Sequence, residues 1–339
     1  MPYRGRDWDE DDVRVRPPKK SRPRTKIRPK HENAATAVVT GVDRGRYRCL
    51  ADGVTVTAMK ARELGRKSIV VGDRVDLVGD LSGSEGTLAR IVRVKERRGV
   101  LRRSADDDNP HERVVVANVD QLVVVASVTD PPISYGFVDR CLVAALDEGI
   151  DPVLCCTKTD LDSGELDEVR RYFTGSGLTI VETSPDRPLD EIRDLVEGRE
   201  NVFFGHSGVG KSTLVNRLIP GAGRAVGEVR SIGKGSHTST SAVSFELPGG
   251  GWVIDTPGVR SFGLAHVTVD SLLDAFPELA EAAQECPKGC EHAADTADCV
   301  LNGVFKDDDP RTARLESFRR MAASLLEAGK NQYGAKGDQ

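Results

Sequence analysis

The residues from Gly205 to Ser212, Gly-His-Ser-Gly-Val-Gly-Lys-Ser, have the spacing of a phosphate-binding loop between an apolar run and a helical pattern. Glycines let backbone N–H groups converge on phosphate oxygens, and the N-terminus of the following helix adds partial positive charge. Lys211 is placed to reach β- and γ-phosphates, and the Ser212 hydroxyl to bind Mg²⁺. The complete motif in this context disfavours a chance glycine-rich turn. The residues expected at the phosphates are Gly205, Ser207, Gly208, Val209, Gly210, Lys211, Ser212 and Thr213.

A second phosphate-facing segment, Asp255-Thr256-Pro257-Gly258, follows the apolar run 252–254. The Asp-x-x-Gly pattern suits a Mg²⁺ contact from the Asp255 carboxylate and a γ-phosphate contact from the Gly258 N–H. The two segments together predict that the chain binds a nucleoside triphosphate with Mg²⁺.

A candidate base-reading element, Thr157-Lys158-Thr159-Asp160, lies upstream of the phosphate loop and follows the apolar run 152–156. The Asp160 carboxylate can accept two N–H groups of guanine that adenine lacks, and the stem of Lys158 can lie along the base. Alone, this segment also fits a surface turn. The following strand end at Thr183 and Ser184, then the phosphate loop, favour the guanine interpretation. The order, base first and phosphates second, is that of a circularly permuted GTPase.

The motifs in this order resemble the ribosome small subunit-dependent GTPase A family of bacterial ribosome-assembly factors. The resemblance runs from about Ala35 to about Leu326. Its motifs are 72–75, 117–122, 139–142, 205–212, 235–240, 255–260 and the cysteines and histidine between 286 and 299. It implies an OB-fold domain, a permuted GTPase domain and a zinc-binding domain. It also implies GTP hydrolysis stimulated by the 30S subunit during late maturation.

Catalysis needs a group other than the glutamine that many GTPases carry after Asp-x-x-Gly, because Val259 stands there. His237, which resembles the switch histidine of the family, and Lys211 are the expected catalytic residues. The alternative for His237 is a loop histidine that only contacts rRNA. Thr238, with Thr240 as the alternative, is expected to complete the Mg²⁺ shell with Ser212 and Asp255.

Two positions depart from the usual guanine site. Thr157 stands where GTPases usually carry Asn, so one orienting amide is missing. Pro185 follows Thr183 and Ser184 and has no backbone N–H for the guanine oxygen. Guanine preference should therefore depend heavily on Asp160.

A metal site is predicted near the C-terminus by three thiols and one imidazole within fourteen residues. The ligands are Cys286, Cys290, His292 and Cys299. They complete a tetrahedral set for one structural Zn²⁺ and leave no position open for catalysis. Four unrelated residues are the alternative, which the clustering disfavours. A catalytic cysteine is disfavoured because thiolates bound to zinc are occupied.

The composition is that of a globular protein: 38% of the 339 residues are hydrophobic and 30% are charged. A net charge of −5 means that any RNA contact must come from local basic patches. No run is long enough for a membrane span, and the charged N-terminus has no apolar signal core. We expect a cytoplasmic monomer with the remaining cysteines as free thiols.

The predicted fold is multidomain α/β. Residues 1–33 form a charged, disordered tail that either contacts rRNA or only solubilises; 34–99 form an OB-fold β-barrel that binds RNA. Residues 100–265 form the permuted GTPase domain with a mainly parallel sheet, and 266–339 form a helical zinc-binding domain and tail. The barrel residues expected to hold phosphates are Lys60, Arg62, Arg66, Lys67, Arg97 and Arg98, with Tyr47 as an isolated aromatic. A helical apolar stripe at 315–326 is expected to be core.

The leading hypothesis is a 30S-stimulated GTPase whose partners are GTP, GDP, the 30S subunit with its 16S rRNA and other small-subunit assembly factors. A nucleotide-gated rRNA-binding module with incidental hydrolysis is the first alternative. A permuted ATPase is the second, suggested by Thr157 and Pro185.

Overall fold

The structure is a computed structural model that describes residues 31–43, 45–65, 68–103, 113–222, 242–256, 262–305 and 309–334, the last without side chains after 327. Residues 33–339 form one compact unit. The proposed tail at 1–33 lies almost wholly outside the described residues. Within the part that is described, no helix is both long and apolar enough to cross a membrane.

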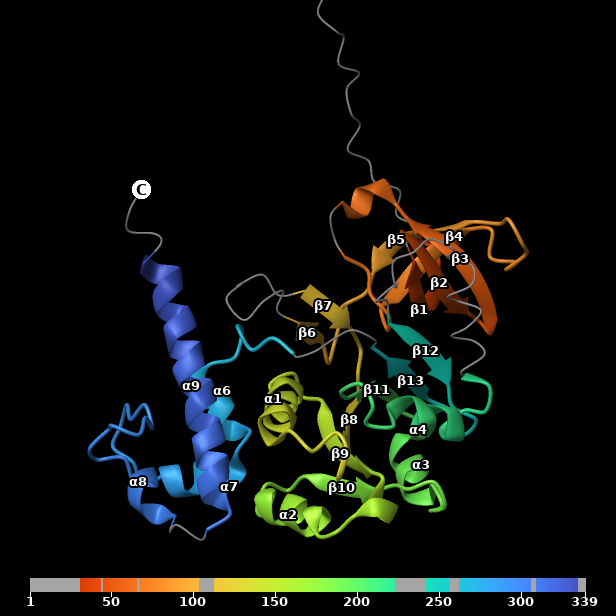
Figure 1. The fold of residues 1–339 in the computed structure, drawn as a ribbon. Coiled ribbons are helices and arrows are strands. Elements are labelled where there is room, and N and C mark those ends of the chain that lie inside the picture. The colour runs from red at the N-terminus through yellow and green to blue at the C-terminus, as the bar shows by residue number, and fades with distance from the viewer. Residues whose placement is uncertain are drawn as a thin grey trace, which may run out of the picture. The chain divides into compact units, whose positions relative to one another are not determined.

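The first five strands form a small barrel, drawn in red and orange in Figure 1. They are β1 (Ala35–Asp43), β2 (Arg46–Ala51), β3 (Val54–Lys60), β4 (Arg74–Gly79) and β5 (Ala89–Val94), with the short 3₁₀ helix η2 (Arg62–Leu64). Pairing of β1 with β4 closes the sheet order β1-β2-β3-β5-β4 into a ring. Alternate residues of each strand point inward, as in small barrels. Tyr47, the isolated aromatic of this region, is one of these buried residues and packs in the barrel core.

The central sheet has the order β10-β9-β8-β11-β13-β12. Its strands are β8 (Gln121–Ser127), β9 (Asp151–Thr157), β10 (Thr179–Glu182), β11 (Glu200–Phe204), β12 (Val243–Glu246) and β13 (Trp252–Asp255). All neighbours pair in parallel except β12, which is antiparallel to β13 and also pairs with β1 of the barrel. The parallel strands are almost fully apolar because both faces are covered.

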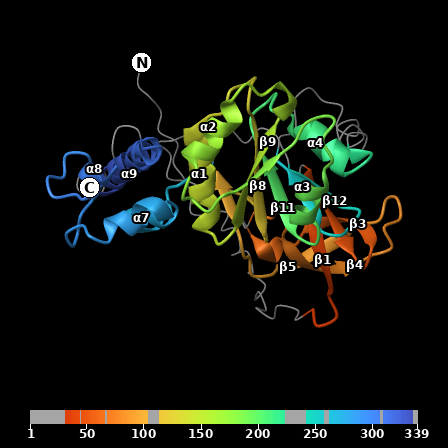
Figure 2. The same cartoon turned by 90° about the horizontal axis from the view of Figure 1, so that it is seen from below.

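Helices cover the two faces of this sheet, as Figure 2 shows. They are α1 (Tyr135–Leu146), α2 (Glu165–Tyr172), α3 (Asp190–Val196) and α4 (Lys211–Leu218), with the 3₁₀ helix η3 (Thr159–Leu161). One core joins α1 and α2 to the side chains of Leu122 and Val124. The other joins α3 and α4 to those of Val123 and Val125 on the opposite face. Parallel strands covered in this way place their carboxyl ends, and the loops that follow, at one edge.

A two-stranded ribbon, β6 (Leu101–Arg103) with β7 (Arg113–Val116), connects the barrel to the central sheet. This ribbon was not predicted, because its strands are only three and four residues long. Such segments carry too few alternations for a period to be recognised.

The C-terminal helices are α6 (Val269–Asp274), α7 (Pro277–Ala283), α8 (Leu301–Val304) and α9 (Arg311–Gly334). The apolar stripe of α9 is core, as expected: Leu315, Phe318, Met321 and Ala322 are buried. In both views these blue helices lie beside α1 and α2. The domain boundaries at 33, 99 and 265 remain predictions.

Candidate functional site

The phosphate loop occupies the expected turn between β11 and α4. Gly205 is required here, because a Cβ at this position would lie 2.3 Å from the carbonyl oxygen of Val125. Gly210 caps α4 with a φ of 90°, a left-handed conformation that other residues rarely adopt. Ser212 and Thr213 are exposed in the first turn of α4. The local sequence therefore places an open, N–H-rich turn at the start of a helix.

Lys211 and Asp255 form an ion pair at this edge. Asp255 ends β13, which lies parallel to β11 with Phe203 opposite Asp255. The side chains of Lys211 and Asp255 are 14% and 22% exposed, so both remain within reach of solvent. Two segments that the sequence places 44 residues apart thus meet through the residues predicted to contact phosphate and Mg²⁺.

The candidate base-reading segment begins at the end of β9, next to the phosphate loop. The hydroxyl of Thr157 donates a hydrogen bond of 2.5 Å to the carbonyl oxygen of Val209. Threonine thus ties the two loops together even though it lacks the amide of asparagine. Lys158 has a φ of 59° and donates from Nζ to the carbonyl oxygen of Asp130. Asp160 is exposed on η3.

The second predicted guanine segment is fastened to the first. The Thr183 N–H donates to the Cys156 carbonyl oxygen at 2.7 Å. The backbone N–H and hydroxyl of Thr159 both lie within 3.4 Å of the Thr183 carbonyl oxygen. Thr183 is buried, whereas Ser184 is half-buried at the surface. The structure thus brings 157–160, 183–184 and 205–213 to one edge of the sheet.

Several predicted site residues fall outside the described residues. They are His237, Thr238, Thr240, Gly258 and Val259. The assignments of a catalytic histidine, a threonine Mg²⁺ ligand and a γ-phosphate N–H therefore remain predictions.

An aromatic support under the phosphate loop was not anticipated. The ring of Phe137 on α1 lies 4.1 Å, between centroids, from that of His206 in the loop. Phe137 also stacks on Phe204, which in turn contacts Phe262 at 4.3 Å. The composition of the loop gives no sign of this support, because its partners come from three separate elements. His206 is therefore packed beside the loop by aromatic contacts.

The buried thiols of the central sheet are poor nucleophiles. Burial raises the pKa of Cys155 and that of Cys156 to about 12. A thiol with such a pKa is protonated at neutral pH, and the thiolate is the reactive form. These cysteines therefore pack as small apolar side chains.

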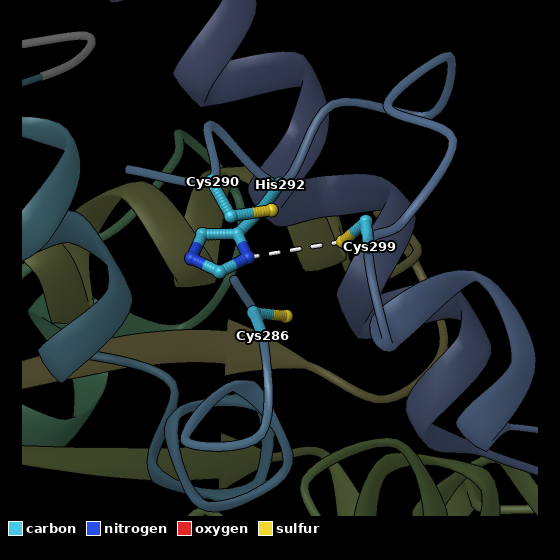
Figure 3. Close-up of side chains that lie close together, drawn as sticks. All are labelled: Cys286, Cys290, His292 and Cys299. Carbon is cyan, nitrogen blue, oxygen red and sulfur yellow. Dashed lines mark hydrogen bonds between the residues drawn. The ribbon is translucent and has the colours of Figure 1, made fainter. Parts of the chain in front are cut away.

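The predicted zinc ligands converge in the loops between α7 and α9 (Figure 3). The ligand atoms of Cys286, Cys290, His292 and Cys299 all lie within 4.8 Å of one another. The distance from Cys299 Sγ to His292 Nδ1 is 3.8 Å, close to the edge of a tetrahedron with zinc bonds of about 2.0–2.3 Å. Burial lowers the pKa of His292, which favours the neutral ring that binds metal. Three thiols and one imidazole in this arrangement fit Zn²⁺.

The surroundings hold the zinc ligands in place. Arg319 of α9 donates from Nε to the carbonyl oxygen of His292 at 3.1 Å. The ring of Phe318 meets the His292 ring edge-on, with 6.3 Å between centroids. The metal-binding loops are thus attached to α9, the longest helix of this part of the chain.

A second cluster of possible ligands lies at Asp147, Glu148 and His266. Glu148 already pairs with Arg102 and accepts the Val100 N–H. His266 Nε2 lies 3.3 Å from Asp147 Oδ2, which suits an ion pair. We assign no metal to this cluster, since these contacts account for its charges.

The basic residues of the barrel differ in availability. Arg97 binds both carboxylate oxygens of Asp73 and the carbonyl oxygen of Ser68, so its expected role as a loop phosphate contact was wrong. Lys60 is the last residue of β3 and lies beside the turn that leads into η2. Arg66 and Lys67 lie outside the described residues.

An exposed row across three strands was missed. Met59 on β3, 45% exposed, has Arg46 on β2 and Arg90 on β5 as direct neighbours. Both arginines are exposed. The row joins residues from separate strands, and only the strand register shows it. It offers two cations around an apolar side chain on the outer face of the barrel.

The fold and the edge loops define a phosphate-loop nucleotide-binding protein of permuted order. A sequence model of the RsgA GTPase family matches residues 94–265. The small ribosomal subunit biogenesis GTPase RsgA of Chlorobaculum parvum is 35% identical over 302 residues, which cover 86% of this chain and 96% of the relative. RsgA of Pseudomonas aeruginosa PAO1 is 36% identical over 268 residues, 77% of each chain. The chain belongs to the RsgA GTPase family.

Solved structures agree with the fold. The crystal structure of YjeQ from Thermotoga maritima superposes with a TM-score of 0.66 at 26% identity, covering 86% of this chain and 98% of the other. YloQ, described as a circularly permuted GTPase, superposes with a TM-score of 0.64 at 23% identity, covering 88% and 98%. The expected permuted architecture with an N-terminal barrel is confirmed.

Proposed function

We propose that this protein hydrolyses GTP to GDP and phosphate and acts in late maturation of the small ribosomal subunit. The observation that carries the proposal is the hydrogen bond from Thr157 to Val209, beside the Lys211–Asp255 pair. It joins a base-reading segment to a phosphate loop at one sheet edge in permuted order. The names of the relatives, small ribosomal subunit biogenesis GTPases, support the biological setting.

At the phosphate end, nucleotide oxygens would replace Asp255 as the partner of Lys211. Ser212 and Asp255 would hold Mg²⁺ together with Thr238, and the Gly258 N–H would contact the γ-phosphate. Bound Mg²⁺ would neutralise charge on the β- and γ-phosphate oxygens. The partial exposure of both side chains supports this, because solvent, and so a nucleotide phosphate, can reach the pair.

At the base end, Asp160 would accept the two guanine N–H groups and Lys158 would lie along the ring. Thr183 and Ser184 would close the opposite side. The hydrogen bonds between the 157–160 and 183–184 segments support a shared pocket. The Thr157 bond to the phosphate loop offsets the missing asparagine in loop positioning.

Hydrolysis would depend on His237, because Val259 has no polar group to orient water. We infer a slow intrinsic rate that rises when the 30S subunit orders this histidine. The chain would contact the 16S rRNA through its barrel, where the Arg46–Met59–Arg90 row offers exposed positive charge to phosphates. Cys286, Cys290, His292 and Cys299 would hold one structural Zn²⁺ per chain, which metal analysis measures. A cytoplasmic monomer that meets other assembly factors on the subunit fits this role.

Base selectivity tests the proposal most simply. Asp160→Asn should weaken GTP binding by about 1–3 kcal/mol, the scale of a hydrogen bond to a charged group, because one guanine N–H loses its acceptor. Titration calorimetry with GTP and ATP measures the change. Asp167→Asn, on the exposed face of α2, is the matched control and should bind GTP like the wild type. Equal wild-type affinity for GTP and ATP would instead support a permuted ATPase.

A further inference from the structure

Arg217 connects the phosphate-binding helix to the guanine-facing loop. It lies in the last turn of α4, on the same helix as Lys211. Its guanidinium donates from Nη1 to the carbonyl oxygen of Ser184 at 2.7 Å and from Nη2 to that of Arg187 at 2.8 Å. A planar guanidinium fixes two acceptors at once, which a lysine cannot do with the same geometry.

The loop that Arg217 holds is otherwise exposed. Residues 185–188 all face solvent. The Arg187 N–H closes a turn onto the Ser184 carbonyl oxygen at 3.3 Å, and Pro185 has no N–H to offer. Upstream, Thr183 is tied to the base-reading segment, and downstream α3 begins at Asp190. Arg217 therefore ties the exposed turn to the helix that carries the phosphate contacts.

We propose that Arg217 is a positioning residue for the guanine base: it holds the 184–187 turn against α4 so that the base and phosphate halves of the pocket close on one nucleotide together. This inference rests on the proposed GTPase function. Arg217 contacts two backbone carbonyls and acts on the base through the turn. Loss of the clamp should free the turn to open, and the nucleotide should leave faster while its phosphate contacts stay intact.

A purely structural role for Arg217 makes a different prediction. A cation in the last turn of a helix stabilises the helix through its dipole. If that were its whole contribution, substitution would lower the melting temperature and weaken base and phosphate binding alike. A comparison of GDP with inorganic pyrophosphate, which has no base, separates the two roles.

The test uses the full-length chain with Arg217→Met, Arg217→Lys and the control Arg193→Met. Arg193 is an exposed arginine of α3 that pairs with Asp190 and does not contact the turn. Arg217→Met should release a fluorescent GDP analogue about 5–20 times faster and weaken GDP binding to the same extent, the scale of two lost hydrogen bonds. Pyrophosphate affinity should stay within about twofold. Arg217→Lys should recover part of the GDP affinity, and Arg193→Met should match the wild type.

Three results would overturn the inference. Unchanged GDP release in Arg217→Met would show that the clamp does not position the base. Equal losses of GDP and pyrophosphate affinity would assign Arg217 a structural role. If Arg217→Met does not fold, Arg217→Lys decides the question by the same two affinities. If the wild-type protein binds ADP as tightly as GDP, the proposed GTPase function is refuted. The role of Arg217 in positioning guanine is then refuted too.

Discussion

Two ion pairs of this chain use the same chemistry in opposite surroundings. The Lys211–Asp255 pair lies at the nucleotide edge with both side chains partly exposed. The pair of Arg314 on α9 with Asp139 on α1 is completely buried, with both side chains 0% exposed. An exposed pair can exchange one partner for a phosphate at little cost, whereas a buried charge cannot be left unpaired. The difference in burial therefore suits Lys211–Asp255 to ligand binding and Arg314–Asp139 to holding two parts of the fold together.

The buried join is made of several contacts. Arg314 donates from Nε to Glu278 of α7 at 2.7 Å, and its guanidinium lies 4.3 Å from the Phe276 ring centroid. The Tyr172 hydroxyl donates to Asp139 at 2.6 Å. Burial raises the pKa of Asp139, and the Arg314 charge opposes that shift. These contacts attach α7 and α9 to α1 and α2 of the GTPase domain.

The largest effect should come from breaking the buried pair. Arg314→Met removes the guanidinium that bridges Asp139 and Glu278, so two buried carboxylates lose this partner. We expect a loss of about 3–5 kcal/mol in the free energy of unfolding, measured with denaturant at pH 7. Arg320→Met, on the same helix but in an exposed pair with Glu316, should change stability by no more than about 0.5 kcal/mol. An equally small change in the free energy of unfolding for Arg314→Met would show that the buried pair does not stabilise the fold more than an exposed one.

Glu200 tests the effect of burial on a single carboxylate, because its side chain is only partly buried. Burial, with the charge of Asp120 beside it, raises its pKa to about 7, and Arg74 and Arg98 oppose the shift. The folded state therefore holds the Glu200 proton more tightly than the unfolded state, in which the pKa is near 4.5. The stability of the fold is highest below pH about 4.5 and falls as the pH rises through 7, where the buried carboxylate becomes charged. At pH 8, Glu200→Gln should therefore stabilise the fold by about 1–2 kcal/mol after allowance for solvent screening.

Unfolding curves at pH 5 and pH 8 measure the Glu200 effect. The gain from Glu200→Gln should shrink toward pH 5, where the wild-type carboxyl is itself largely protonated. Glu246→Gln, on the exposed side of β12, should show no such pH dependence. An equal effect at both pH values would mean that Glu200 is not held near neutral pKa.

The smallest effect on stability should come from the partly exposed Lys211–Asp255 pair. Lys211→Met should change the free energy of unfolding by less than about 1 kcal/mol, because the pair is near solvent. The same variant should lose binding of Mg²⁺–GTP, which calorimetry detects. Destabilisation comparable to that of Arg314→Met would show that Lys211–Asp255 is a structural join.

The sequence predicted the parts of this molecule that depend on local spacing. The 205–212 loop and the cluster of three cysteines and one histidine at 286–299 need only residues close in the chain, so their types and intervals define them. The contacts of Arg314 with Asp139 and of Arg217 with Ser184 join residues 175 and 33 positions apart, and no local period indicates them. The contact of Arg97 with Asp73 joins residues 24 positions apart in the same way, and the burial of Tyr47 follows from which face of β2 its side chain occupies.

The proposed function is hydrolysis of GTP that is stimulated by the small ribosomal subunit. Steady-state phosphate release from GTP and from ATP, with and without purified 30S subunits, tests it most directly. We predict slow release from GTP alone, a rise by orders of magnitude with 30S subunits, and little release from ATP under either condition. Equal rates of phosphate release from GTP and ATP would contradict the proposed guanine selectivity. A GTP rate that 30S subunits leave unchanged would contradict the proposed stimulation.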